Sequence, residues 1–370
     1  MNSVKYIGMD VHTATISVAV LDVAGKLIME SVIETKASTI LQLIQGLRGD
    51  LHVTFEEGTW AAWLYDLLKL YVTKIVVCDP RRNPLLKEGN KSDRIDARKL
   101  AELLRANLLR SVYHGEKSLR TVKELVRSYL TFGKDLTRVM NRVKAIFRSW
   151  GIPCGGKSVY NPRHRDEWLS KIAEVGVRRR AELYYAQLDA LVSLRPQARR
   201  KLLAESRKHS AWKSLRSIPA LGPIRVALLM GIVQTPHRFR SKRPLWKYSG
   251  FGVVTHTSAD HRYVEGQLER SKKPVSVRGL DPNHNHHLKD LFKGAAIQAA
   301  TREGPLWEFY EALVAKGMRP EMARLTLARK IAAITLTVCR KGVALDAQYL
   351  KPQTAGVSLS RIRSIPGDLS

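Results

Sequence analysis

The chain has 370 residues, with 63 Lys and Arg against 33 Asp and Glu, which gives a formal net charge of +30. A protein with this much positive charge attracts polyanions, and its binding to them depends strongly on salt. We therefore expect a nucleic-acid partner. The sequence has no apolar run of transmembrane length and no N-terminal signal peptide, which argues against a membrane protein. Its 44% content of hydrophobic residues allows two or more sizeable cores.

The cysteines indicate a reducing compartment. Cys78, Cys154 and Cys339 are widely spaced and odd in number, and no CxxC pair is present. This pattern favours neither a disulfide framework nor a zinc finger. We therefore expect a cytoplasmic protein.

The first hundred residues alternate between strand and helix patterns. Five apolar or alternating runs predict strands at residues 4–9, 15–21, 26–33, 51–55 and 75–78. Amphipathic stretches predict helices at residues 38–47, 61–70 and 94–104. The alternation predicts a mixed α/β sheet domain over residues 1–110.

Four carboxylates stand at the ends of these elements, although acidic residues are scarce in the chain. Asp10 follows the first strand and Glu56 ends the fourth, while Asp93 and Asp96 open the third helix on one face. Each residue alone is equally explained as a turn residue or a helix cap. Brought together, they would repel one another unless a shared cation held them, and hard oxygen ligands suit Mg²⁺ or Mn²⁺. Such ions are the usual device for phosphoryl transfer on nucleic acids.

Long basic helices are predicted to follow the sheet domain. Apolar residues recur at three- and four-residue spacing over residues 116–150, with Arg and Lys between them, and glycines and a proline then break the pattern. A second helical tract at residues 166–209 is predicted to return antiparallel to the first. For residues 111–210 we favour a coiled-coil arm over simple packing.

Residues 211–345 are predicted to form a mainly helical domain. A Pro/Gly turn at residues 217–223 is explained equally well as a phosphate-binding turn or as a plain helix connection. Further helices are predicted at residues 244–248, 288–301 and 322–340, with a mobile polar loop at 255–266, a basic loop at 270–278 and a frayed tail at 346–370. The tryptophans, including Trp60 and Trp63, are predicted to lie in the core.

Short motifs in both halves of the chain resemble those of one protein family. The motifs are Ile7-Gly8-Met9-Asp10-Val11-His12, Phe55-Glu56, Trp63-Leu64-Tyr65-Asp66, Lys91-Ser92-Asp93-Arg94-Ile95-Asp96-Ala97, Ser217-Ile218-Pro219, Tyr248-Ser249-Gly250-Phe251 and Arg278-Gly279-Leu280. In order and spacing they resemble the DEDD transposases of bacterial insertion sequences of the IS-one-ten family. The resemblance covers most of the chain.

The resemblance implies a RuvC/RNase H-like N-terminal domain whose metal-binding tetrad is Asp10, Glu56, Asp93 and Asp96. Glu57 is the alternative to Glu56. We prefer Glu56, because its distance from Leu64-Tyr65-Asp66 fits the family and because adjacent strand residues point to opposite faces.

The resemblance also implies a nucleophilic serine in a C-terminal transposase domain, and Ser258 takes that position. Ser249 is the alternative. Two departures from the family pattern weaken the assignment of Ser258, since the preceding turn lacks its proline and Ala259 follows the serine in place of glycine. Likewise, Ala220 replaces a glycine expected in the turn at residues 217–223.

The family further implies a recombinase guided by a structured non-coding RNA that pairs with donor and target DNA. We expect a homo-oligomer, a dimer or a tetramer, associated with the bacterial nucleoid. The predicted activity is metal-dependent strand cleavage and exchange through a serine–DNA link. The alternatives are a hydrolytic nuclease of the Holliday-junction type and a non-enzymatic nucleic-acid scaffold.

Overall fold

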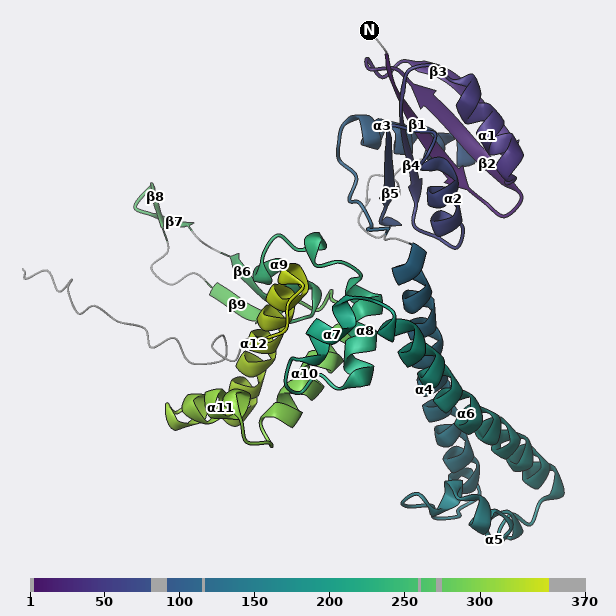
Figure 1. The fold of residues 1–370 in the computed structure, drawn as a ribbon, viewed down its shortest axis with the longest axis vertical. Coiled ribbons are helices and arrows are strands. Elements are labelled where there is room, and N and C mark those ends of the chain that lie inside the picture. Colours follow the sequence, from purple (N-terminus) through teal and green to yellow (C-terminus); the bar gives the residue numbers. More distant parts are fainter. Residues whose placement is uncertain (1–2, 81–91, 115–116, 259–260, 271–274, 346–370) are drawn as a thin grey trace, which may run out of the picture. The chain divides into compact units, whose positions relative to one another are not determined.

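The computed structural model describes residues 3–80, 92–114, 117–258, 261–270 and 275–345 (Figure 1). The chain forms two compact units, Met1–Gly115 and Glu116–Ser370, and most contacts between Cα atoms lie within one unit or the other. Within the described ranges, no helix is both long and apolar enough to cross a membrane.

The first unit is built on a five-stranded sheet. Its strands are β1 (Val4–Val11), β2 (Thr15–Leu21), β3 (Leu27–Glu34), β4 (Asp50–Glu56) and β5 (Lys74–Cys78), in the order β3-β2-β1-β4-β5. β1, β2 and β3 pair antiparallel, whereas β4 and β5 run parallel to β1. Parallel strands need crossover connections, and helices α1 (Ala37–Gly46) and α2 (Ala61–Leu68) supply them. The mixed α/β sheet predicted from the sequence is confirmed.

Helices cover both faces of this sheet. Because side chains alternate along a strand, Ile7 and Met9 of β1 face one way and belong to the core beneath α1 and α2. Helix α3 (Asp93–Arg105) packs on the other face, against β1 and β2. It lies very close at Gly8, where an added Cβ would come within 2.1 Å of the Ala97 carbonyl oxygen. Glycine at this position therefore fixes how α3 lies on the sheet.

The second unit begins with two long helices, α4 (Lys117–Ser149) and α6 (Val175–Arg207), which pack along each other (Figure 1). The single helix predicted for residues 166–209 is wrong, because α5 (Arg165–Ser170) ends before α6 begins. Ile172, between them, is buried in the local core, and its carbonyl oxygen accepts hydrogen bonds from the Arg178 guanidinium at 2.7 and 3.1 Å. These contacts favour a bend over a continuous helix.

The rest of the second unit is mainly helical, as predicted. Its helices are α7 (Ala211–Arg216), α8 (Pro223–Val233), α9 (Lys242–Tyr248), α10 (His286–Ala299), α11 (Pro305–Ala315) and α12 (Pro320–Lys341). Their core also takes in Val122 and Val126 of α4. The turn before α8 places Ala220 at φ 67°, a backbone conformation that favours glycine. Helix α11 was not predicted, although Pro305 at its first turn is a recognised start signal.

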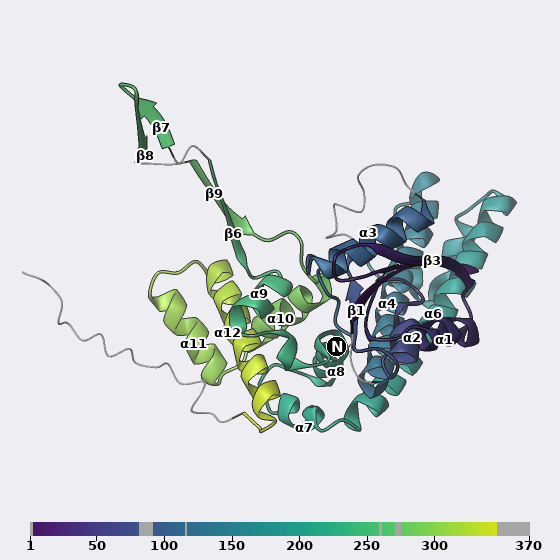
Figure 2. The same ribbon diagram turned by 90° about the horizontal axis from the view of Figure 1, so that it is seen from above.

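The mobile polar loop predicted for residues 255–266 is wrong, because most of this stretch forms strands. β6 (Val253–Ser258) pairs antiparallel with β9 (Val275–Leu280), and β7 (His261–Val264) pairs with β8 (Gln267–Arg270) (Figure 2). Positive φ angles at Glu265 and Gly266, 49° and 80°, fit a two-residue hairpin turn. The basic loop predicted for residues 270–278 is also wrong in its described part, where the chain belongs to β8 and β9. The predicted tail at 346–370 lies outside the described residues.

Candidate metal centre

Asp10 and Glu56 lie side by side at the carboxyl ends of two parallel strands. In the pairing of β1 with β4, Gly8 is opposite Thr54 and Met9 is opposite Phe55. Asp10 and Glu56 are the next residues along, so they continue the same register. Residues paired in register point to the same face of a sheet, and here that is the face of Gly8, which α3 covers.

Asp93 and Asp96 reach this face from the first turn of α3. The helix begins after Ser92, whose hydroxyl oxygen accepts a hydrogen bond from the Ile95 N–H at 3.3 Å. Ser92 is therefore the capping residue, which leaves the Asp93 carboxylate available for other contacts. Three separate elements, β1, β4 and α3, thus carry the four predicted carboxylates to one face of the sheet at its carboxyl edge.

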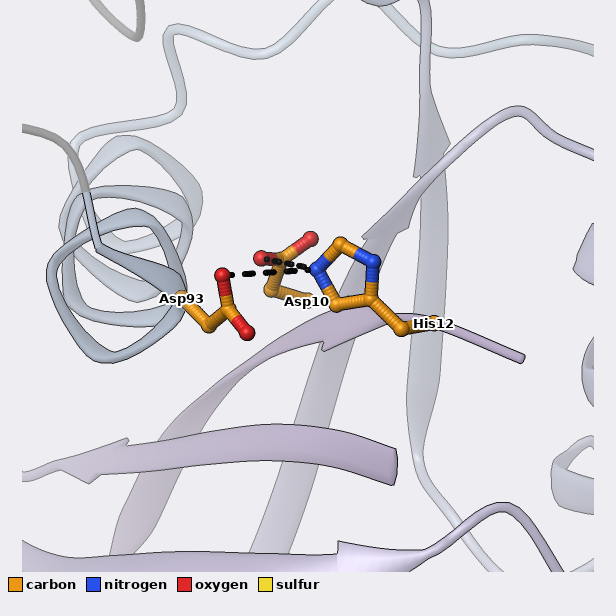
Figure 3. A group of neighbouring side chains, drawn as sticks. All are labelled: Asp10, His12 and Asp93. Atoms are coloured by element: carbon orange, nitrogen blue, oxygen red, sulfur yellow. Dashed lines mark hydrogen bonds and ion pairs between the residues drawn. The ribbon is translucent and has the colours of Figure 1, made fainter. Parts of the chain in front are cut away.

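His12 joins two of these carboxylates (Figure 3). Its Nε2 atom lies 3.1 Å from Oδ2 of Asp10 and 3.5 Å from Oδ1 of Asp93. Ligand atoms of Asp10, His12 and Asp93 all lie within 4.8 Å of one another, a spacing that a single metal ion can span. His12 was not among the ligands predicted from the sequence. His12 directly follows the end of β1 and stands two residues after Asp10, a spacing that puts two side chains on the same side of an extended chain.

The electrostatics of the cluster favour a cation. Burial raises the pKa of Asp10, contact with His12 opposes that rise, and the negative charges of Asp93 and Asp96 add to it. Oδ1 of Asp96 is buried and has no hydrogen-bond partner among the described residues. A buried carboxylate oxygen without a partner is unfavourable, and a bound cation would satisfy it. The carboxylate oxygens are donors that suit Mg²⁺ or Mn²⁺, whereas an imidazole is a softer donor.

Glu57, the alternative to Glu56, is held on the opposite face of the sheet. Its Oε2 atom lies 2.7 Å from Nε2 of His114, whose side chain is only 5% exposed. The His114 ring in turn stacks on Tyr65 of α2, with ring centroids 5.0 Å apart. Glu57 thus fastens the chain near residue 114 to the α2 side, away from the face that Asp10 shares with α3.

The two candidate serines differ in their surroundings. Ser249 directly follows α9 and is fully buried, and its hydroxyl donates a hydrogen bond to the Leu245 carbonyl oxygen at 2.7 Å. Ser258 is the last residue of β6, with its backbone opposite Val275. Its side chain lies outside the described part of the structure. The hydroxyl of Ser249 is thus already engaged in a structural hydrogen bond.

Two family models match the chain. One, for DEDD transposases of the IS110 type, matches residues 7–151, and the other, described as Transposase IS116/IS110/IS902 family, matches residues 213–311. The chain belongs to the IS110 (IS-one-ten) family of transposases. The first match contains all four predicted carboxylates, and the second contains Ser249 and Ser258. A search of curated proteins found no match. Membership of the IS110 family makes the chain a DNA-cleaving and recombining enzyme with DNA as its substrate.

Proposed function

We propose that this IS110 transposase cleaves and exchanges DNA strands at a divalent-metal centre in its first unit. The proposal is supported by the cluster of Asp10, His12 and Asp93, whose ligand atoms lie within 4.8 Å of one another, and by the strand register and helix start that put Glu56 and Asp96 on the same face. We propose in addition that this unit is a RuvC-like domain. Its strand order and its change from antiparallel to parallel pairing at β1 support that assignment.

In this proposal the four carboxylates hold Mg²⁺ or Mn²⁺. When bound, the ion supplies positive charge that polarises the scissile phosphate and stabilises charge developing on its oxygens. His12 contacts Asp10 and Asp93 together, so its imidazole keeps the two carboxylates oriented toward one point. Without a cation the carboxylates repel a phosphate, which restricts cleavage to the metal-loaded protein.

We also propose that Ser258 is the nucleophile. Its hydroxyl oxygen would bond to phosphorus while the bond from phosphorus to the leaving sugar oxygen breaks, and that oxygen takes up the proton released by the serine. The resulting phosphoserine link keeps the bond energy needed for strand exchange. The buried, hydrogen-bonded state of Ser249 supports the choice of Ser258.

A structured non-coding RNA is the guide in our proposal, pairing with donor and target DNA. The net charge of +30 supports binding of long polyanions. We retain a four-part division at residues 1–110, 111–210, 211–345 and 346–370, with α4 and α6 as a coiled-coil arm in a homo-oligomer. A separate core far along α4 and α6, around Phe147, Trp168 and Tyr185, supports a distinct arm.

A trapping experiment tests the reaction. The protein is incubated with its element-end DNA and Mg²⁺, denatured and digested, and the peptides are searched for an attached nucleotide. We expect the adduct on Ser258, no adduct with Ser258→Ala, and no adduct when EDTA removes the metal. Ser249→Ala serves as the matched control and should still form it.

Each contrary outcome has a definite meaning. Metal-dependent cleavage without any adduct would favour the hydrolytic nuclease, in which water attacks in place of the serine. Cleavage that persists in EDTA would overturn the metal centre itself.

A further inference from the structure

Two tryptophans of the first unit are exposed, although the sequence predicted them to be core residues. Trp60 and Trp63 are each 36% exposed, and their rings meet edge to face with centroids 5.7 Å apart at 68°. In such a pair, the ring that offers its edge keeps both of its own faces free of the other ring. Exposed tryptophan pairs are uncommon on a surface without a partner, because each ring leaves a large apolar area in water.

The pair follows one of the candidate ligands closely along the chain. Trp60 follows Glu56 by four residues, at the point where α2 begins after the carboxyl end of β4. Helix α2 buries Ala61, Leu64 and Leu68 against the sheet. Trp63 therefore points away from the core, and the connection from β4 to α2 joins the pair to the carboxyl end of β4. The four carboxylates lie on the α3 face at the carboxyl ends of β1 and β4, and the tryptophans belong to the segment that leaves β4 on the α2 face.

We propose that Trp60 and Trp63 form a stacking platform for an unpaired DNA base next to the phosphate that the carboxylates act on. This inference rests on the proposed function of the carboxylate site. Indole rings stack on any base through its π-face, without reading its sequence. Bases inside a duplex have no free face, whereas strand exchange requires bases to leave their partners. A platform of this kind binds bases of the opened strand and makes no stacking contact with the intact duplex.

The platform has a measurable consequence for binding. Stacking on one aromatic side chain strengthens the binding of single-stranded nucleic acid by roughly 5- to 150-fold per base. We therefore expect the protein to prefer DNA with a short unpaired segment over a fully paired duplex, and the preference to depend on Trp60 and Trp63. Affinity for the paired duplex comes from phosphate contacts and should not depend on them.

The test compares two fluorescent DNA probes of equal length and charge, a paired duplex and the same duplex with a central bubble of unpaired thymidines around one 2-aminopurine. Binding is followed by anisotropy in EDTA, so that no cleavage occurs. Trp60→Ala and Trp63→Ala should each lower the preference for the bubble by about 5-fold or more, and the double variant by more still. Trp60→Phe and Trp63→Phe should keep most of it. Wild-type protein should also quench 2-aminopurine, as stacking requires.

Tyr71 provides a matched control, since it is 44% exposed and follows the other end of α2. Tyr71→Ala should bind both probes like the wild type. The proposal is overturned if the alanine variants keep the full bubble preference, or if they lose affinity for the paired duplex equally. Asp10→Ala separates it from the proposed function, because this variant should keep the bubble preference and lose only cleavage. Cleavage that survives in Asp10→Ala would contradict the metal site and leave the platform result standing.

Discussion

At the scale of single residues, the metal-free protein holds Asp10 in an unfavourable state. Burial is the largest cause of its raised pKa, and the negative charges of Asp93 and Asp96 contribute in the same direction. A carboxyl group with a higher pKa in the folded than in the unfolded protein destabilises the fold at pH values where it is ionised. The contact with His12 offsets only part of this effect. Proteins often accept such a loss of stability at a functional site.

Asp10→Asn should therefore stabilise the metal-free protein at neutral pH. The amide keeps nearly the same shape and cannot ionise, so we expect the first unit to melt a few degrees higher, ~2–5 °C. The difference should shrink as the pH falls toward the raised pKa, because wild-type Asp10 then becomes protonated. Calorimetry in EDTA across this pH range measures it. A variant that melts below the wild type at neutral pH would show that the contact with His12 outweighs burial and repulsion.

Most of the candidate site residues could be predicted from the sequence. Asp10, Glu56, Asp93 and Asp96 were identifiable because each ends or begins a recognisable element, and the strand register then explains how Asp10 meets Glu56. His12 was overlooked because its spacing of two residues from Asp10 is a weak signal on its own. The exposure of Trp60 and Trp63 depends on which side of α2 faces the sheet. That orientation is fixed by tertiary packing and is ambiguous over a helix of eight residues.

At the scale of elements, the contact of α3 with β1 assembles the site. The helix carries Asp93 and Asp96, and its backbone lies directly on Gly8. The sheet and most helices were predictable from hydrophobic periodicity. The strands β6 to β9 were not, because they are short and carry polar or charged residues, as in Gln267-Leu268-Glu269-Arg270 of β8, which hide the apolar alternation of a strand. The bend between α5 and α6 depends on burial of Ile172 and on the Arg178 contact, which no local pattern reveals.

Gly8→Ala should disrupt the site by moving a helix. The added methyl group would overlap the Ala97 carbonyl oxygen and the Ala101 nitrogen, so α3 must shift away from β1. We expect a loss of about 1–3 kcal/mol in stability and much weaker metal binding, since Asp93 and Asp96 move with the helix. Gly46→Ala is the matched control, because no atom lies within 4 Å of a Cβ at that position. Equal metal binding by the Gly8 variant and the wild type would show that α3 does not position the ligands.

At the scale of the whole molecule, the overall positive charge and the carboxylate cluster have opposite effects on nucleic acid. The net charge of +30 attracts nucleic acid of any sequence, whereas the carboxylate cluster repels phosphate until a cation binds. General attraction and local selection are thus carried by different residues. This division agrees with a protein that holds nucleic-acid backbones and leaves sequence reading to base pairing.

Binding of nucleic acid should accordingly fall steeply with salt. Each neutralised phosphate adds about 0.9 to the slope of log affinity against log salt, so a protein making six or more such contacts loses roughly a thousandfold between about 50 and 200 mM. Filter binding over this range measures the slope. At fixed salt, RNA transcribed from the DNA flanking the gene should bind more tightly than unrelated RNA of equal length. Equal binding of the two RNAs would remove the support for an RNA guide.

The most direct test of the central claim is a titration with Mn²⁺, followed by electron paramagnetic resonance, on the full-length protein and a pair of neighbouring variants. Glu56 and Glu57 have the same chemistry and adjacent positions but point to opposite faces of the sheet. We predict that Glu56→Gln weakens Mn²⁺ binding by at least about tenfold, whereas Glu57→Gln binds like the wild type once circular dichroism confirms that both are folded. Wild-type affinity in Glu56→Gln, or lost binding in a folded Glu57→Gln, would contradict a metal centre built on the α3 face.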